Sequence, residues 1–237
     1  MTPKDDAALD RLLNQWAAAP HAAPLAERTS RQIETTLEAS LAPVRPLPPQ
    51  PKLALRFWAV FAACSLVLIA LLDKAGFHLM TGWQMTWMAA IFAAGALLFS
   101  WALAAGMVPG SRLRVSPALA VAGGAAGIVA GFALLFPWRT AAGFVPEGRP
   151  CALLELMIAL PASGIFWLLA RRGALVASAA LGAALSGLAI FLALAPLQFQ
   201  CMFPNAPHLL VWHAGTAILL VGLGACAGRI WEHRKLL

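Results

Sequence analysis

Two cysteines stand out in a largely apolar chain because polar, metal-binding side chains accompany each of them. Glu155 follows Cys151 by four residues, a spacing that puts both side chains on one face of a helix. His208 and His213 follow Cys201, and His213 lies deeper in the apolar run that comes next. Thiolate, imidazole and carboxylate groups together bind soft or borderline ions such as Cu(I) or Zn(II). The pattern predicts a metal or thiol site with Cys151 and Cys201 as its reactive groups.

The spacing of these residues leaves more than one interpretation open. The cysteines do not form a paired Cys-x-x-Cys motif, which would indicate a zinc site or a thioredoxin-like enzyme. We interpret the pair as a sensor of metal or oxidant, and a static structural disulfide is the alternative. Glu155 and His213 fit a ligand role and a buried hydrogen-bonded pair equally well. The other two cysteines, Cys64 and Cys226, are expected to be packing residues.

The elements that must position these residues are membrane-spanning helices. The chain of 237 residues is 61% hydrophobic and 11% charged, whereas an ordinary soluble domain carries about 25% charge. A helix needs about 20 apolar residues to cross a bilayer, and six runs qualify. They lie near Leu53–Leu72, Thr86–Met107, Pro117–Phe136, Cys151–Ala170, Ala174–Ala195 and Pro207–Gly228.

The runs predict an all-α membrane protein in which six helices form one compact bundle. Gly, Ala and Ser are frequent within the runs, and such small residues let helix backbones approach closely in lipid. Proline and glycine punctuate the stretches between the runs and favour turns. We therefore expect Pro146, Pro150 and Pro196 to lie in the connections, with Cys151 at the start of the fourth span.

The distribution of Lys and Arg predicts the orientation of the bundle. With the N-terminus in the cytoplasm, the cytoplasmic flanks of the spans hold nine basic residues and the opposite flanks hold three. Cytoplasmic loops carry the excess of Lys and Arg in membrane proteins. Both termini are therefore predicted to be cytoplasmic, and Cys151 and Cys201 to lie on the outer side. In a Gram-negative cell that side of the inner membrane is the periplasm, where disulfides form.

The first fifty residues are polar and predict short amphipathic helices on a tether. Leu9, Leu12, Leu13 and Trp16 fall at i, i+3, i+4 and i+7, which is one face of a helix. A second candidate helix carries Ile33 and Leu37 four residues apart. Five prolines in residues 42–51 then form a semi-rigid spacer that leads into the first span.

This N-terminal segment is too short to bury a core of its own, so its apolar faces require a partner. Helices that lie on a membrane favour a polar face rich in Lys and Arg, but residues 1–50 hold five basic and six acidic residues. We therefore expect a protein partner that takes the helix in a groove, with the membrane surface as the alternative. The chain divides into residues 1–50 as a partner-binding segment and residues 51–237 as a transmembrane sensor domain.

Several other function classes receive little support from the sequence. It contains no phosphate-binding loop, no His-Glu-x-x-His motif and no elbow serine with its base and acid, so we expect no enzyme. Direct nucleic-acid binding would require basic residues clustered with aromatic ones in a soluble segment. A small transporter or channel would need polar residues along the spans, and a membrane thiol oxidoreductase would need closely spaced cysteines. These two remain the alternatives to a regulatory protein.

The second half of the chain resembles the NrsF-like membrane anti-sigma factors, the negative regulators of sigma F. The resemblance is carried by Cys151, Leu160-Pro161, LLARRGA at 168–174, Cys201, VWH at 211–213 and GACAGR at 224–229. It covers most of residues 51–237. Three features depart from the common pattern of the family. Gln200 precedes Cys201 where histidine is frequent, and Met202-Phe203 follow it where acidic residues are frequent. His213 follows Trp212 where tyrosine is commoner.

The resemblance implies a six-span inner-membrane protein with a short cytoplasmic N-terminus. It implies that the cytoplasmic portion sequesters an extracytoplasmic-function (ECF) sigma factor. It also implies that metal or oxidant stress, sensed through the pair Cys151 and Cys201, releases that sigma factor. A Cu or Zn ion at the cysteine pair would be the corresponding ligand.

Overall fold

The structure is a computed structural model in which the chain divides into two units, residues 1–46 and 47–237. In the first unit it describes residues 31–36, which form a helix whose Ile33 is 45% exposed. The other residues predicted to bind a partner, Leu9, Leu12, Leu13, Trp16 and Leu37, lie outside the described residues. In the second unit it describes residues 47–73, 75–108, 115–139, 144–171 and 179–234.

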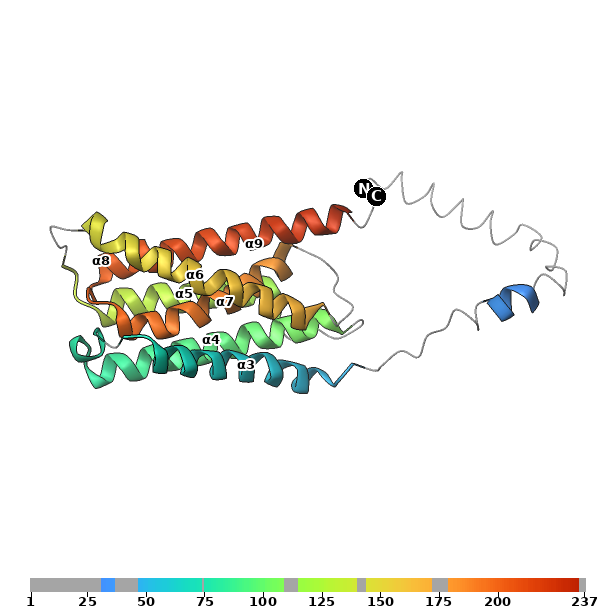
Figure 1. The fold of residues 1–237 in the computed structure, drawn as a ribbon, viewed down its shortest axis with the longest axis horizontal. Helices are drawn as coiled ribbons and strands as arrows, with labels where there is room; N and C mark the ends of the chain where they lie inside the picture. The colour runs from blue at the N-terminus through green and yellow to red at the C-terminus, as the bar shows by residue number, and fades with distance from the viewer. Residues whose placement is uncertain are drawn as a thin grey trace, which may run out of the picture. The chain divides into compact units, whose positions relative to one another are not determined.

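The second unit is a bundle of helices, six of which are long and apolar enough to span a membrane (Figure 1). Five of these spans are the single helices α3 (Gln50–Leu71), α4 (Gly82–Met107), α5 (Pro117–Leu135), α6 (Phe144–Ala170) and α7 (Ala179–Gln200). The sixth runs from Ala206 to His233 and comprises α8 (Ala206–His208), the π-helix η2 (Leu209–Ala214) and α9 (Gly215–Arg234). A short 3-10 turn, η1 (Phe77–Leu79), joins α3 to α4. The prediction of a six-helix membrane bundle is confirmed.

Helices α4 and α5 begin where the sequence supplies caps. Thr81 forms a capping box with Gln84, in which each side chain accepts the other residue's backbone N–H. Ser116 caps α5 by accepting the N–H of Leu119 at 3.1 Å, and Pro117 follows as a favourable first residue. The Gln84 side chain also donates to the carbonyl of Leu135 at 2.7 Å. This bond joins the start of α4 to the end of α5 at one end of the bundle.

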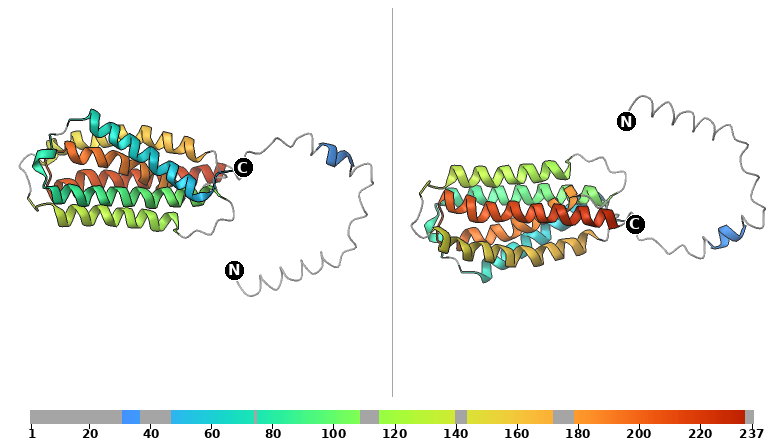
Figure 2. Two further views of the ribbon diagram at one scale, coloured as in Figure 1. Left: turned by 90° about the horizontal axis from the view of Figure 1, so that it is seen from below. Right: turned by 90° about the horizontal axis from the view of Figure 1, so that it is seen from above.

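Helix α7 lies at the centre and packs against α3, α4, α5, α6 and α9, while all six helices run side by side (Figures 1 and 2). Its buried Phe191 makes edge-to-face contacts with Phe92 and Phe99, with ring centroids 5.9 and 5.3 Å apart. Glycine makes room for these rings, because a Cβ added to Gly187 would lie 2.5 Å from the Phe99 ring. The small residues of the spans therefore serve close packing, as expected for helices in lipid.

The expectation that Pro146, Pro150 and Pro196 lie in the connections was wrong. Helix α6 begins at Phe144 and α7 continues to Gln200, so all three prolines lie within helices. A proline removes only its own N–H bond, and packing against neighbouring helices tolerates that loss in membrane proteins. As a result Cys151 lies two turns inside α6 instead of at the start of the span.

Helices α7 and α9 approach each other closely at glycines. A Cβ added to Gly224 of α9 would lie 2.7 Å from the carbonyl oxygen of Gly182 and would also overlap Ser186. A Cβ added to Gly222, two residues earlier on the same helix, would meet nothing within 4 Å. The change from glycine to alanine can therefore be compared at a closely packed position, Gly224, and at an open one, Gly222.

Gly224→Ala should destabilise the bundle by about 1–3 kcal/mol, the usual cost of overpacking a close contact. Gly222→Ala should leave the free energy of unfolding unchanged or raise it slightly, because alanine favours helix. Unfolding of the purified protein in mixed detergent micelles, followed by circular dichroism, measures both. Equal effects from the two variants would contradict the close α7–α9 contact.

Candidate metal and redox site

Three elements bring the predicted site residues to the end of the bundle where α8 lies (Figure 1). Helix α6 carries Cys151 and Glu155, the residue after α7 is Cys201, and α8 with η2 carries His208 and His213. The ligand atoms of the two cysteines and the two histidines all lie within 4.8 Å of one another. We call these four residues the Cys2His2 cluster.

Backbone hydrogen bonds fix the short connection that holds Cys201. The N–H of Cys201 donates to the carbonyl of Leu197 at 2.9 Å and so continues the last turn of α7. Asn205 caps α8 by accepting the N–H of His208 at 3.1 Å. The N–H of Ala206 donates to the carbonyl of Pro137 at 2.9 Å, which joins the connection to the segment after α5.

The two histidines meet because the chain between them forms a π-helix. They are five residues apart, and in an α-helix this spacing would turn their side chains about 140° away from each other. The π-helix η2 (Leu209–Ala214) instead bonds residues five apart, as in the bond from the Gly215 N–H to the Leu210 carbonyl. The imidazole centroids of His208 and His213 consequently lie 5.5 Å apart. The sequence analysis predicted a plain helix here and missed the π-turn.

Glu155 lies behind His213 and outside the Cys2His2 cluster. Its carboxylate is fully buried, and its Oε2 lies 3.9 Å from Nδ1 of His213. That separation is longer than a hydrogen bond, so a small side-chain rotation would be needed to form one. Glu155 is thus placed to orient His213, while Nε2 of His213 faces no hydrogen-bond partner among the described residues.

The thiols are in contact with each other and both are free. Cys201 is buried, and its sulfur lies within 4.8 Å of the Cys151 sulfur. The interaction with Cys151 and burial raise the pKa of the Cys201 thiol above the ordinary value. Cys151 is half-buried, and its S–H donates to the carbonyl of Glu147 at 3.9 Å. The pair therefore presents one protected and one more accessible sulfur.

A cavity of about 240 Å³ leads to the two sulfur atoms. It lies between the first turns of α6 and the end of α7. Its lining combines both cysteines with polar and apolar side chains, namely Glu147, Pro150, Cys151, Leu154, Leu197, Gln200, Cys201, Met202 and Phe203. A small ion or oxidant can therefore reach the thiols without passing through the core.

Comparison with known proteins identifies the family of this chain. Residues 37–232 match the family described as the negative regulator of sigma F, NrsF. The chain belongs to the NrsF family. No curated protein and no solved structure matches it. NrsF membership shows an anti-sigma regulator with a sigma factor as its partner, and the six apolar helices show that this regulator is a multi-pass membrane protein.

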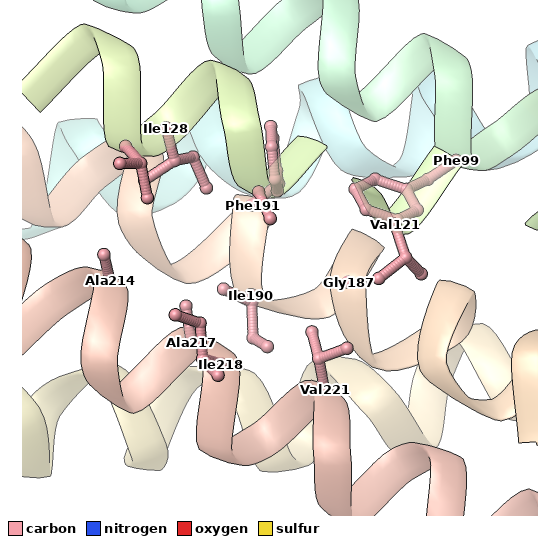
Figure 3. A pocket seen from close by; sticks show the side chains of 12 residues that line it. Phe99, Val121, Ile128, Gly187, Ile190, Phe191, Ala214, Ala217, Ile218 and Val221 are labelled. Carbon is pink, nitrogen blue, oxygen red and sulfur yellow. The ribbon is translucent and has the colours of Figure 1, made fainter. Parts of the chain in front are cut away.

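A second cavity in this NrsF protein bears on the transporter alternative (Figure 3). It has a volume of about 160 Å³ and lies between α4, α5, α7 and α9. All of its lining residues are apolar or glycine, and Phe99, Ile128, Ile190 and Val221 are among them. Such a lining offers no ligands to a polar solute, so this cavity does not favour a transport path.

Mild oxidation of the NrsF protein should link Cys151 to Cys201. A disulfide needs sulfur atoms about 2 Å apart, and these two sulfurs start within 4.8 Å of each other. Peptide mapping after treatment with one equivalent of hypochlorite should show this single link. Cys64 and Cys226 should still react with a maleimide, and a mixture of links that included them would contradict the arrangement.

Proposed function

We propose that this protein is an inner-membrane anti-sigma factor that sequesters an ECF-type sigma factor through its cytoplasmic N-terminal segment. A metal or an oxidant arriving from the periplasm acts on Cys151 and Cys201, and the sigma factor is then released. The protein acts as a regulator and not as an enzyme. Family membership supports the sigma-factor partner. The observation that carries the sensing role is the contact of two free thiols and two imidazoles within 4.8 Å.

The proposed orientation rests on the positive-inside rule. The end of the bundle away from the Cys2His2 cluster carries Lys52, Arg56, Arg171 and Arg229 at the ends of α3, α6 and α9. With these residues in the cytoplasm, nine basic residues flank the cytoplasmic ends of the spans and three flank the other ends. The cluster then lies toward the periplasm, outside the reducing cytoplasm.

The proposed sigma-binding segment is residues 1–50, joined to α3 by its proline-rich spacer. The spacing of its apolar residues predicts one helical face made of Leu9, Leu12, Leu13 and Trp16 and another made of Ile33 and Leu37. The segment is net acidic by one charge, since it has six acidic and five basic residues. An amphipathic helix laid into a groove of the sigma factor is the binding mode that fits these features.

Signal transfer across the membrane is proposed to follow α9. This helix continues directly from the cluster through η2 and ends at Arg234 on the opposite side. The glycines at the interface between α9 and α7 bring the two helices into close contact. Disulfide formation or metal binding would move α6 relative to η2, and a tightly packed bundle responds to such a change by switching between discrete arrangements.

The partner-binding role can be tested in the full-length protein. The double variant Leu12→Glu and Trp16→Glu should reduce the amount of sigma factor that co-purifies at least about tenfold, because buried apolar anchors carry most of the binding energy of such helices. Gln15→Glu, on the polar face of the same predicted helix, should have little effect. Equal co-purification from wild type and the double variant would exclude this segment as the binding site.

The sensing role can be tested with a transcriptional reporter for the sigma factor. Cys201→Ser should abolish the change in reporter activity that metal or hypochlorite produces, since serine forms no disulfide and is a poor ligand for soft ions. Cys64→Ser is the matched control and should respond as wild type does. A normal response from Cys201→Ser would remove the cysteine pair from the mechanism.

A further inference from the structure

We infer that Cys151, Cys201, His208 and His213 form a four-ligand site for one tetrahedral divalent ion of the zinc class, with Glu155 orienting His213 from outside. This inference rests on the proposed function and deepens it. It names the ion class and the ligands of the sensor. It also gives different roles to His213 and Glu155, which are buried beside each other. Glu155 is a positioning residue and does not bind the ion.

The distances suit a tetrahedral site. Zinc binds cysteine sulfur at about 2.3 Å and histidine nitrogen at about 2.0–2.1 Å, so its four ligand atoms lie roughly 3.3–3.8 Å apart. The four ligand atoms of the cluster lie within 4.8 Å of one another. Closing them around an ion therefore requires shifts of about 1 Å, which side-chain rotations can supply.

Unpartnered nitrogen atoms point to a bound cation at this place. Nε2 of His208 and Nε2 of His213 are both buried and have no hydrogen-bond partner among the described residues. A buried polar atom without a hydrogen-bond partner destabilises the folded protein. An ion bound between the imidazoles and the thiolates would satisfy both nitrogens at once. Both histidines are almost fully buried, with 1% of each residue exposed.

Glu155 lies where known metal sites place a carboxylate that holds a metal-binding histidine in position. A histidine that binds a metal through one nitrogen commonly donates the N–H of the other nitrogen to a carboxylate. Nδ1 of His213 lies 3.9 Å from the Glu155 carboxylate, whereas its Nε2 lacks a partner. We therefore assign Nδ1 of His213 to the carboxylate and Nε2 to the ion.

Charge and ligand type favour Zn(II) over other ions. Two thiolates neutralise a divalent ion, whereas with Cu(I) they would leave a net negative charge in a buried site, which is costly to desolvate. Two sulfur and two imidazole ligands in a tetrahedron are typical of zinc. Calcium and magnesium require oxygen ligands, which the cluster lacks. Four protein ligands also leave no open position for substrate, which is a feature of structural and not of catalytic zinc sites.

The site would hold the outer ends of three elements together. One ligand comes from α6, one from the connection after α7, and two from α8 and η2. Binding of the ion would draw the four ligands together and so change the spacing of these elements. This is the movement of α6 relative to η2 that the proposed function requires for release of the sigma factor.

The test uses the reduced full-length protein in detergent, with Zn(II) and Co(II) as probes. We expect one Zn(II) per chain, and we expect Co(II) to give the intense visible absorption of tetrahedral coordination with a thiolate charge-transfer band. Cys201→Ser and His213→Phe should each lower the affinity for Zn(II) at least about tenfold, since each removes one ligand. Glu155→Gln should keep the tetrahedral spectrum and lower the affinity about 10–100-fold.

Matched controls separate ligand loss from misfolding. His213→Phe keeps an aromatic ring against Phe132, whose centroid lies 6.4 Å from that of His213. His78→Phe makes the same change at an exposed histidine of η1 and should bind Zn(II) as wild type does. Circular dichroism confirms the helix content of each variant. Absence of a tetrahedral Co(II) spectrum in the wild type, or a spectrum unchanged by His213→Phe, would overturn the inference.

Failure of the site and failure of the proposed function give different results. A protein that binds Zn(II) through these ligands but retains no sigma factor would uphold the site and remove the proposed function. A protein that retains the sigma factor but binds no Zn(II) would overturn the site while leaving sequestration intact.

Discussion

The burial of α7 among the other helices is the constraint on which the rest of the structure depends. Nearly every residue from Leu181 to Gln198 is packed against a neighbouring helix. Even its polar Gln198 is buried, where its amide contacts the sulfur of Met80 at 3.4 Å. Because Cys201 follows the last turn directly, the position of its sulfur is set by the packing of the whole helix. The thiol pair is thus assembled by the core of the bundle and not by a flexible loop.

Polar groups at this depth face an environment in which they must satisfy one another. In water, an unpartnered imidazole or carboxylate would cost little, but in a buried setting each one reduces stability. The Cys2His2 cluster and the neighbouring carboxylate of Glu155 lie next to the apolar rings of Phe132 and Phe203. These polar groups can be satisfied in two ways, by a bound cation or by side-chain rotations that form hydrogen bonds among them. A sensor requires this kind of choice between states.

Much of this arrangement could be predicted from the sequence because it follows from local properties. Hydropathy located the six spans, and alternation of the spans brought Cys151 and Cys201 to the same end. The i, i+4 spacing of Cys151 and Glu155 placed them on one face of α6. The ends of α6 and α7 were missed because Pro150 and Pro196 act as helix breakers in water, whereas tertiary packing overrides that tendency here.

The meeting of the two histidines could not be predicted from standard helical periodicity. A spacing of five places them on different faces of an α-helix, so helical periodicity gives no reason to expect the two imidazoles to meet. Two polar residues five apart in an apolar span were nevertheless a usable signal, because a π-turn brings residues at this spacing together. The partner-binding residues of the N-terminal segment remain predictions.

The π-turn has a consequence for how this site can vary among related chains. It amounts to one residue inserted into an otherwise α-helical span. A chain that lacked one residue between His208 and His213 would place the two histidines four apart, where an ordinary α-helix aligns them on one face. The ligand pair can therefore be encoded by two different lengths of chain. A gap of one residue at this position should accompany the loss of the π-turn and not the loss of the histidine pair.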